Sequence, residues 1–337
     1  MTLSRAIRCV YCLESKPPEQ FNRDHVMPEL LGTFRNNLVL HEIVCTDCNG
    51  TLGKQTETVL GRGSFEGYVR FDQGVVKDPN SARRFMRARV PIRLARGTDR
   101  AGLRVEVVAD RGVRYRPAPQ ISVQHRLESA PRYLIIEEFL AASDSEIVGC
   151  EIHVITEEGG AEHDHLVRIV KQRVPDFEAP PPRIEKATRQ LVLEFTHILD
   201  HALTRAFAKI AFNYLAYVAG SEFVLQRDFD EVRRFIRWSE GGPNHFVQVN
   251  DEPILAEESS HRRLQRHHLL TVQWEGRHRH GQDWIHARVA PFNLLTYHVR
   301  LCGPFRGIWR DINSGHRFDL DACDVYELRS YRRSLIP

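Results

Sequence analysis

The sequence predicts an α+β protein in which a small N-terminal module precedes a larger region of mixed helices and strands. Three observations support this prediction. Two Cys-x-x-Cys pairs, Cys9/Cys12 and Cys45/Cys48, lie within the first fifty residues. Beyond Gly74 the chain changes to short apolar segments separated by Gly, Pro and Asp, which is typical of strands. A long apolar stripe at helical spacing then occupies residues 186–219.

Length and composition exclude several classes of protein. With 337 residues the chain is long enough for two domains, and its hydrophobic (42%) and charged (27%) fractions are those of a folded globular protein. It has no apolar run long enough to span a membrane, and residues 1–10 lack the apolar core of a secretory signal, so we expect a cytoplasmic protein. The net charge is only +3, so nucleic-acid binding would need local basic surfaces.

Residues 1–70 are interpreted as a module that a metal ion stabilises. Four cysteines in two pairs are the ligand set of a closed, tetrahedral structural zinc site. The expected ligands are Cys9, Cys12, Cys45 and Cys48. The segment has little apolar sequence of its own, so zinc is the expected source of its stability. Residues 51–60 can form a helix, which would place the second cysteine pair near a helix N-terminus.

Residues 75–337 are expected to form one mixed domain, strand-rich over 80–160, helical over 186–240 and strand-rich again over 245–337. The helix at 186–219 ends at Gly220, and its apolar stripe is expected to be core. A second helix is expected over 229–238, with Asp228 as its N-cap. The remaining cysteines are expected to be buried thiols. They are Cys150, Cys302 and Cys323.

Three residues suited to hydrolysis accompany the cysteine pairs. Asp24 and His25 lie between the pairs, and Asn49 directly follows the last cysteine. If zinc joins the two ends, the intervening chain can fold as a hairpin that leads into a helix, and His25 and Asn49 then face one cleft. An acid, an imidazole and an amide brought together suit the hydrolysis of a phosphodiester assisted by a second metal ion.

The order of these motifs resembles that of a known family. Cys-x-x-Cys is followed by Asp-His-Val-Met-Pro, Leu-Leu-Gly, Asn-Leu and finally Cys-x-x-Cys-Asn-x-x-Leu-Gly-Lys, over residues 9–60. This order is similar to the HNH endonucleases of the ββα-metal, or His-Me finger, superfamily, and within them to a bacterial subgroup with an N-terminal four-cysteine module. The segment 206–217 resembles the sequence that comes after the module in that subgroup. The resemblance implies a zinc-stapled ββα-metal module that hydrolyses DNA.

The resemblance also implies a role for each site residue. His25 would be the general base, because a neutral imidazole near pH 7 can accept a proton from water. Asp24 and Asn49 would hold one catalytic divalent ion, Mg²⁺ or Mn²⁺, since hard oxygen donors suit those ions. Asn37 matches the asparagine that orients the histidine, although it stands farther from Cys45 than is usual. His41 is the alternative for that role.

The implied partner is DNA, with duplex favoured over single-stranded DNA, and RNA is a third possibility. Such modules occur in restriction and phage-defence systems, so a defence role is a hypothesis based on family association. One module has one active centre, so a double-strand break would need two protomers of a homo-oligomer or two sequential nicks. The alternative from another class is a non-catalytic zinc module that binds nucleic acid or a protein partner.

Two basic segments leave nucleic-acid contact and an ordinary solvated surface as open interpretations. The first contains Arg83, Arg84, Arg87, Arg89, Arg93 and Arg96. The second combines histidine and arginine over residues 261–268 and 277–280, with Trp274 and Trp284 nearby.

Overall fold

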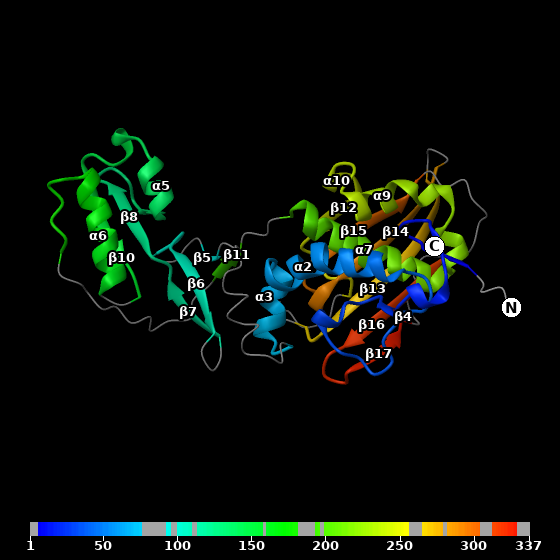
Figure 1. Cartoon of the computed structure of the whole chain (residues 1–337). Coiled ribbons are helices and arrows are strands. Elements are labelled where there is room, and N and C mark those ends of the chain that lie inside the picture. Colours follow the sequence, from blue (N-terminus) through cyan, green and yellow to red (C-terminus); the bar gives the residue numbers. More distant parts are fainter. Residues whose placement is uncertain are drawn as a thin grey trace. The chain divides into compact units, whose positions relative to one another are not determined.

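The computed structural model describes residues 6–75, 92–95, 100–109, 113–157, 160–180, 193–195, 199–255, 265–278, 282–303 and 312–328. Helices and sheets are both present, which confirms the α+β class (Figure 1). The chain divides into a main unit, Met1–Asp78 with Leu199–Pro337, and an inserted unit, Pro79–Ile198. This division differs from the predicted single domain over 75–337, because the C-terminal part folds together with the N-terminal module.

The N-terminal part of the main unit consists of short strands followed by a continuous helical segment. Strand β1 (Ile7–Arg8) pairs with β2 (Ser15–Lys16), and β3 (Asp24–His25) pairs with β4 (Val39–Leu40), both antiparallel. The 3-10 turns η1 (Pro18–Gln20) and η2 (Glu29–Leu31) precede and follow β3. Helix α1 (Thr46–Leu52) continues through the π-helical turn η3 (Gly53–Glu57) into α2 (Thr58–Arg62), and α3 (Phe65–Asp72) comes next.

Helix α1 begins where the second cysteine pair lies. Cys45 is its N-cap, in an extended conformation, and Cys48 lies in its first turn. The predicted helix near residues 51–60 is therefore confirmed, and it starts earlier than expected. The order β3, β4, α1 places two paired strands and a helix between the two ends of the cysteine motif.

Helix α7 (His201–Ala219) is the central helix of the main unit. Asp200 caps it, because its carboxylate accepts a hydrogen bond of 2.8 Å from Leu203 N, and Gly220 with φ +88° ends it. Nearly every residue from Leu203 to Ala216 is buried, as expected for a helix enclosed on all sides. The prediction that the helix starts at residue 186 was wrong, because Leu193–Phe195 forms strand β11 and pairs with β5.

Four short helical segments come after α7: α8 (Ser221–Val224), the 3-10 turn η5 (Arg227–Phe229), α9 (Asp230–Trp238) and α10 (Pro243–Phe246). The predicted second helix is confirmed as α9. The predicted N-cap Asp228 lies one residue too early, inside η5, and Phe229 occupies the cap position without a side-chain hydrogen bond.

A six-stranded antiparallel sheet completes the main unit, in the order β12-β15-β14-β13-β16-β17. Its strands are β12 (Val247–Asn250), β13 (His267–His278), β14 (Gln282–Ala290), β15 (Thr296–Cys302), β16 (Asn313–Asp319) and β17 (Asp324–Glu327), and the turn η6 (Pro291–Asn293) joins β14 to β15. Helix α7 packs on β13, β14 and β15 and also contacts β4, η3 and α2 (Figure 1). It therefore lies between the sheet and the N-terminal module.

The inserted unit contains two antiparallel sheets, with the orders β11-β5-β6-β7 and β10-β8-β9. Its strands are β5 (Ile92–Leu94), β6 (Arg104–Ala109), β7 (Val113–Pro117), β8 (Gln120–His125), β9 (Arg132–Leu134), β10 (Cys150–Ile155) and β11 (Leu193–Phe195). Helices α5 (Ile136–Ala141) and α6 (Ala161–Arg173) accompany them, with the 3-10 turn η4 (Asp144–Glu146). Phe139, Leu166 and Ile121 form the centre of its core.

The cysteines outside the two pairs behave differently from one another. Cys302 is buried, as predicted, whereas Cys150 is half-buried and Cys323 is exposed. Cys323 lies in the turn between β16 and β17, where φ is +50°, so the surface position follows from the hairpin. Within the described ranges, none of the helices has both the length and the apolar character that a membrane crossing requires.

Candidate active site

The four paired cysteines converge on one point. Their sulfur atoms all lie within 4.8 Å of one another, and the Sγ atoms of Cys12 and Cys45 are 3.9 Å apart. Zinc–sulfur bonds of about 2.3 Å in a tetrahedron place sulfurs about 3.8 Å apart, so this donor set fits a structural zinc ion. The predicted site of Cys9, Cys12, Cys45 and Cys48 is thereby brought together, with the knuckle after β1 facing the start of α1.

Helix α9 holds the cysteine cluster from a distant part of the sequence. Arg237 Nη1 donates a hydrogen bond of 2.9 Å to Cys48 Sγ. One turn earlier, Arg233 Nε donates to the carbonyl of Val10, between the first two cysteines, at 2.6 Å. Four thiolates around a zinc ion carry a net negative charge, so the permanently charged Arg237 guanidinium stabilises them.

Strands β3 and β4 form the hairpin that carries the predicted acid and base. Asp24 lies opposite Leu40, and His25 lies opposite Val39. Successive side chains of a strand point to opposite faces. Asp24 accordingly points inward and is only 4% exposed, whereas the His25 side chain is 27% exposed.

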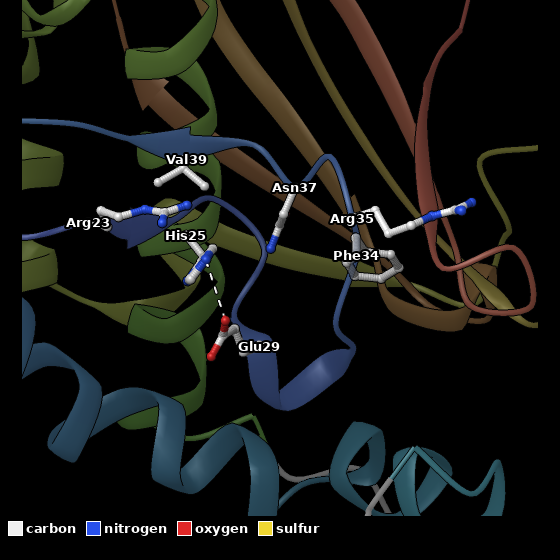
Figure 2. Close-up of a pocket in the computed structure, with 7 residues that line it drawn as sticks. All are labelled: Arg23, His25, Glu29, Phe34, Arg35, Asn37 and Val39. Atoms are coloured by element: carbon white, nitrogen blue, oxygen red, sulfur yellow. Dashed lines mark ion pairs between the residues drawn. The ribbon is translucent and has the colours of Figure 1, made fainter.

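His25 faces an open pocket of about 290 Å³ (Figure 2). The lining residues are Arg23, His25, Glu29, Phe34, Arg35, Asn37 and Val39. Glu29 Oε1 lies 3.5 Å from His25 Nε2, which favours a proton on that nitrogen and leaves Nδ1 to accept one. The Arg23 side chain is exposed, and its guanidinium has no hydrogen-bond or ion-pair partner among the described residues. Within the described ranges, Arg23 is therefore an unpaired cation beside the imidazole.

Asn37 lies in the same pocket as His25. Its Oδ1 atom is buried and has no hydrogen-bond partner in the described part of the chain. A buried carbonyl oxygen without a partner is rare and points to a functional group that it would contact. His41, the alternative, is exposed in the bend after β4 and is not among the lining residues. The position of Asn37 thus suits the role of orienting His25 better than that of His41.

The loop before Asn37 is attached to the edge of the large sheet. Asn36 Nδ2 donates to Val325 O at 3.0 Å, and Val325 N donates to Asn36 Oδ1 at 2.7 Å. Arg35 forms an ion pair of 3.4 Å with Asp324, and Figure 2 shows its side chain extending away from His25. The pocket is therefore held in shape by β17, more than 280 residues along the chain.

Asp24 is enclosed by polar side chains of helix α7. Its Oδ1 accepts from Lys209 Nζ at 3.0 Å, and its Oδ2 accepts from Asn213 Nδ2 at 3.0 Å. Asn213 Oδ1 in turn accepts from the Tyr11 hydroxyl at 2.7 Å. Since Tyr11 lies between Cys9 and Cys12, this chain of hydrogen bonds connects the cysteine cluster to the acid.

Lys209 bridges two carboxylates. Its Nζ atom lies 2.9 Å from Glu57 Oε1 as well as 3.0 Å from Asp24 Oδ1. Complete burial on its own would lower the pKa of Lys209, but the two carboxylates outweigh this effect and raise its pKa. The lysine is therefore a buried permanent cation beside the predicted acid.

Asn49 reaches toward the start of β3 from helix α1. Its Nδ2 donates to Asn22 Oδ1 at 3.1 Å and to Arg23 O at 3.4 Å, next to the peptide bond of Asp24. Asn49 does not line the pocket that contains His25. These hydrogen bonds place the Asn49 amide at the start of β3, and the predicted shared cleft of His25 and Asn49 is not found among the described pockets.

Asp24 and Asn49 offer oxygen donors of the kind that bind a divalent ion. Each Asp24 oxygen accepts one hydrogen bond and keeps a second lone pair, and Asn49 Oδ1 has no partner among the described residues. Gly53 lies between Asn49 and Glu57 on the helix, and a Cβ atom built there would have only Glu57 Oε2 within 4.0 Å. Hard oxygen donors of this kind are the ligands that Mg²⁺ and Mn²⁺ prefer, and these ions also keep several water ligands.

Sequence reasoning missed three residues that contact the predicted acid or its partner: Glu57, Lys209 and Asn213. A signal for two of them was present. Arg205, Lys209 and Asn213 repeat every four residues in an otherwise apolar helix, which is the spacing of one helix face. Glu57 carried no comparable signal.

The basic segments give a mixed result. Of the first, only Arg93 lies in the described part, exposed on β5, and Arg83, Arg84, Arg87, Arg89 and Arg96 lie outside it. Of the second, His267 and His268 are 2% and 0% exposed, so nucleic-acid contact by these two is wrong. The side chains of residues 261–263 and 277–280 lie outside the described part. Trp274 and Trp284 are half-buried.

Residues 9–64 match the family model described as HNH endonuclease. The match begins at the first cysteine of the cluster and includes Asp24, His25, Asn37 and Asn49. It confirms the resemblance of the N-terminal module to that family, and it indicates a nuclease that acts on nucleic acid. Helix α7, which supplies Lys209, lies outside the matched segment. Comparisons with curated proteins and with solved structures found no match.

Proposed function

We propose that this protein is a divalent-metal-dependent endonuclease that hydrolyses phosphodiester bonds of duplex DNA, with His25 as its general base. The observation that carries the proposal is the position of His25 in an open pocket, beside a carboxylate, a free cation and an unpaired amide oxygen. A buried histidine could not receive a substrate. A solvent-exposed one without partners would have no fixed orientation.

His25 activates a water molecule in this proposal. Glu29 stabilises the tautomer with the proton on Nε2, and Nδ1 accepts the proton of the attacking water. Asn37 acts as a positioning residue, because it lies in the same pocket and its unused Oδ1 can share the Nε2 proton of His25 with Glu29. General bases of this kind contribute a rate factor of about 10² to 10⁴.

Arg23 binds the phosphate beside the imidazole. Its guanidinium is exposed, lines the pocket and has no partner among the described residues, so it is available for two parallel hydrogen bonds to phosphate oxygens. Asp24 and Asn49 would hold the Mg²⁺ or Mn²⁺ ion. When bound, that ion supplies neutralisation of the phosphate charge and stabilises the leaving oxygen.

The test is cleavage of supercoiled plasmid by zinc-loaded protein in the presence of Mg²⁺ or Mn²⁺. We expect nicking that the variant His25→Ala reduces by about 10² to 10⁴. His41→Ala is the matched control, since His41 is an exposed histidine of the same hairpin outside the pocket, and it should keep full activity. Parallel reactions with labelled RNA test the choice of DNA.

Binding of DNA without cleavage by wild type and by both variants would refute the proposal and favour a non-catalytic zinc module. Conversion of the supercoiled plasmid first to the nicked circle would agree with one active centre per chain. Conversion directly to the linear form would point to a pair of protomers. A role in restriction or phage defence is tested separately, by challenging cells that express the wild type or His25→Ala with phage.

A further inference from the structure

The polar face of α7 is the feature that the nuclease proposal does not use. Arg205, Lys209 and Asn213 are 8%, 1% and 0% exposed, and all three reach across to the N-terminal module. Arg205 Nη2 donates to Gln55 Oε1 at 2.9 Å, one turn from the contacts of Lys209. A helix enclosed by protein rarely carries such a row of polar groups unless each has a partner.

We infer that Lys209 is an internal cation that competes with the divalent ion for Asp24 and Glu57, and so sets the affinity of the site for that ion. The inference rests on the proposed function, because it concerns the ion of the same site. Its basis is geometric. One ammonium group bridges two carboxylates at 3.0 Å and 2.9 Å, and Asp24, which carries one of them, is a proposed ligand of the ion.

The side chains of Asp24, Glu57 and Lys209 together carry a net charge of minus one. Without the lysine, two carboxylates would share the site and attract a divalent cation strongly, as paired carboxylates do in magnesium sites. With the lysine present, an approaching ion meets a fixed positive charge within a few ångströms in a poorly solvated place, and this repulsion weakens binding. The ion is therefore held loosely by the protein alone.

A bound phosphate changes this balance. A substrate phosphate bound at Arg23 adds negative charge near the site, and this charge would offset the repulsion between Lys209 and the ion. Lys209 thus couples uptake of the ion to the presence of substrate, and it keeps the two carboxylates compensated when no ion is bound. Lys209 is a positioning residue in this scheme, since its side chain is only 1% exposed and contacts no substrate.

The inference also assigns Glu57 to the ion site. Glu57 lies on the π-helical turn η3, is 24% exposed and faces the open space beside Gly53. It is the only other carboxylate that contacts Lys209 among the described residues. Removal of Glu57 and removal of Lys209 should therefore change ion affinity in opposite directions.

The experiment measures Mn²⁺ binding to the full-length, zinc-loaded protein without DNA, from the electron paramagnetic resonance signal of free Mn²⁺. We expect Lys209→Met to bind Mn²⁺ about tenfold or more tightly than wild type, and Glu57→Gln to bind about tenfold more weakly. Arg205→Met is the matched control, because it removes a buried cation of the same helix face that does not contact Asp24. Its affinity should stay within about twofold of wild type.

Lys209→Met leaves two carboxylates uncompensated, so a double variant protects the test against a folding failure. Lys209→Met with Glu57→Gln keeps the net charge at minus one and should bind Mn²⁺ within about threefold of wild type. Unchanged or weaker binding by Lys209→Met, or no binding by any variant, overturns the inference. Neither result bears on plasmid cleavage by His25, so failure here is distinguishable from failure of the proposed function.

Discussion

Buried His268 makes the main unit lose stability as the pH falls toward 4. Phe292 N donates a hydrogen bond of 2.9 Å to its Nδ1 atom, so Nδ1 must carry a lone pair, and Nε2 donates to Leu31 O at 2.8 Å. Protonation of Nδ1 would place two N–H groups against each other. Complete burial, with the charge of neighbouring His267, lowers the pKa of His268 from 6.5 to about 4, although the hydrogen bond to Leu31 O acts in the opposite direction.

The direction of the pH effect on stability follows from the difference between the pKa of His268 in the unfolded chain and in the folded chain. Between about pH 6.5 and pH 4 the unfolded chain binds a proton at His268 and the folded chain does not. The free energy of unfolding therefore falls as the pH falls through this window, and the effect is complete below about pH 4. A difference of 2.5 between 6.5 and 4 corresponds to about 3 kcal/mol, at about 1.4 kcal/mol for each pKa unit.

The assay is urea unfolding of wild type and His268→Gln, followed by tryptophan fluorescence between about pH 7 and about pH 4.5. Zinc release also depends on pH, but it is common to both proteins, so the comparison concerns the difference between their slopes. His268→Gln should be less stable than wild type at pH 7. The slope of its free energy of unfolding against pH should be smaller, by the equivalent of about one proton taken up on unfolding. Equal slopes would refute the reasoning, as would a nitrogen-15 spectrum that shows a charged His268 ring in folded protein at about pH 5.5.

Two further predictions concern the cysteine cluster and the pocket. Arg237→Met should weaken zinc binding by about tenfold to a hundredfold, because Cys48 loses its charged hydrogen-bond donor. Competition with a chromogenic chelator measures the zinc affinity, and Arg234→Met on the exposed side of α9 is the control. Asn37→Ala should lower the rate of plasmid cleavage by about tenfold or more. The urea midpoint of unfolding should stay close to that of wild type, since Asn37 Oδ1 has no partner to lose among the described residues. An equal loss of activity in His41→Ala would contradict the assignment of Asn37 as the residue that orients His25.

The local features of the site were predictable from sequence because short-range chemistry determines them. Cys-x-x-Cys spacing brings two thiolates of each pair to one metal, and the helix predicted near the second pair is present, although it begins directly after Cys45 rather than at residue 51. The region predicted to be strand-rich, residues 245–337, contains β13, β14 and β15, since alternating apolar residues indicate a half-buried strand.

The errors occurred where tertiary contacts decide the outcome. Residues 193–195 suit an apolar helical stripe, yet they form β11 because β5 offers a hydrogen-bonding edge. His267 and His268 resembled a basic surface, but they begin β13 and point into the core. Composition cannot distinguish a buried histidine with two backbone partners from an exposed one.

The opposite orientations of Asp24 and His25 follow from strand alternation, but their separate surroundings do not. Helix α7 packs against the Asp24 face, and that packing is a contact across 185 residues of sequence. The apolar periodicity of α7 was visible and predicted a core helix. The repeat of polar residues at every fourth position of α7 was equally visible in the sequence. It could be interpreted only once the residues of the N-terminal module that these side chains contact were known.

The position of α7 has a consequence for the module that matches the HNH family. Zinc can join Cys9 and Cys12 to Cys45 and Cys48, but it does not compensate the charge of Asp24 or provide a partner for the buried Tyr11 hydroxyl. Lys209 and Asn213 do both, from a helix whose other faces pack on the large sheet. In residues 9–64 alone, the Asp24 carboxylate and the Tyr11 hydroxyl would therefore be exposed to solvent or left without a partner. A buried charge without a partner lowers the free energy of unfolding by several kcal/mol. For this reason the hairpin and the sheet fold as one unit, and the geometry around His25 depends on both.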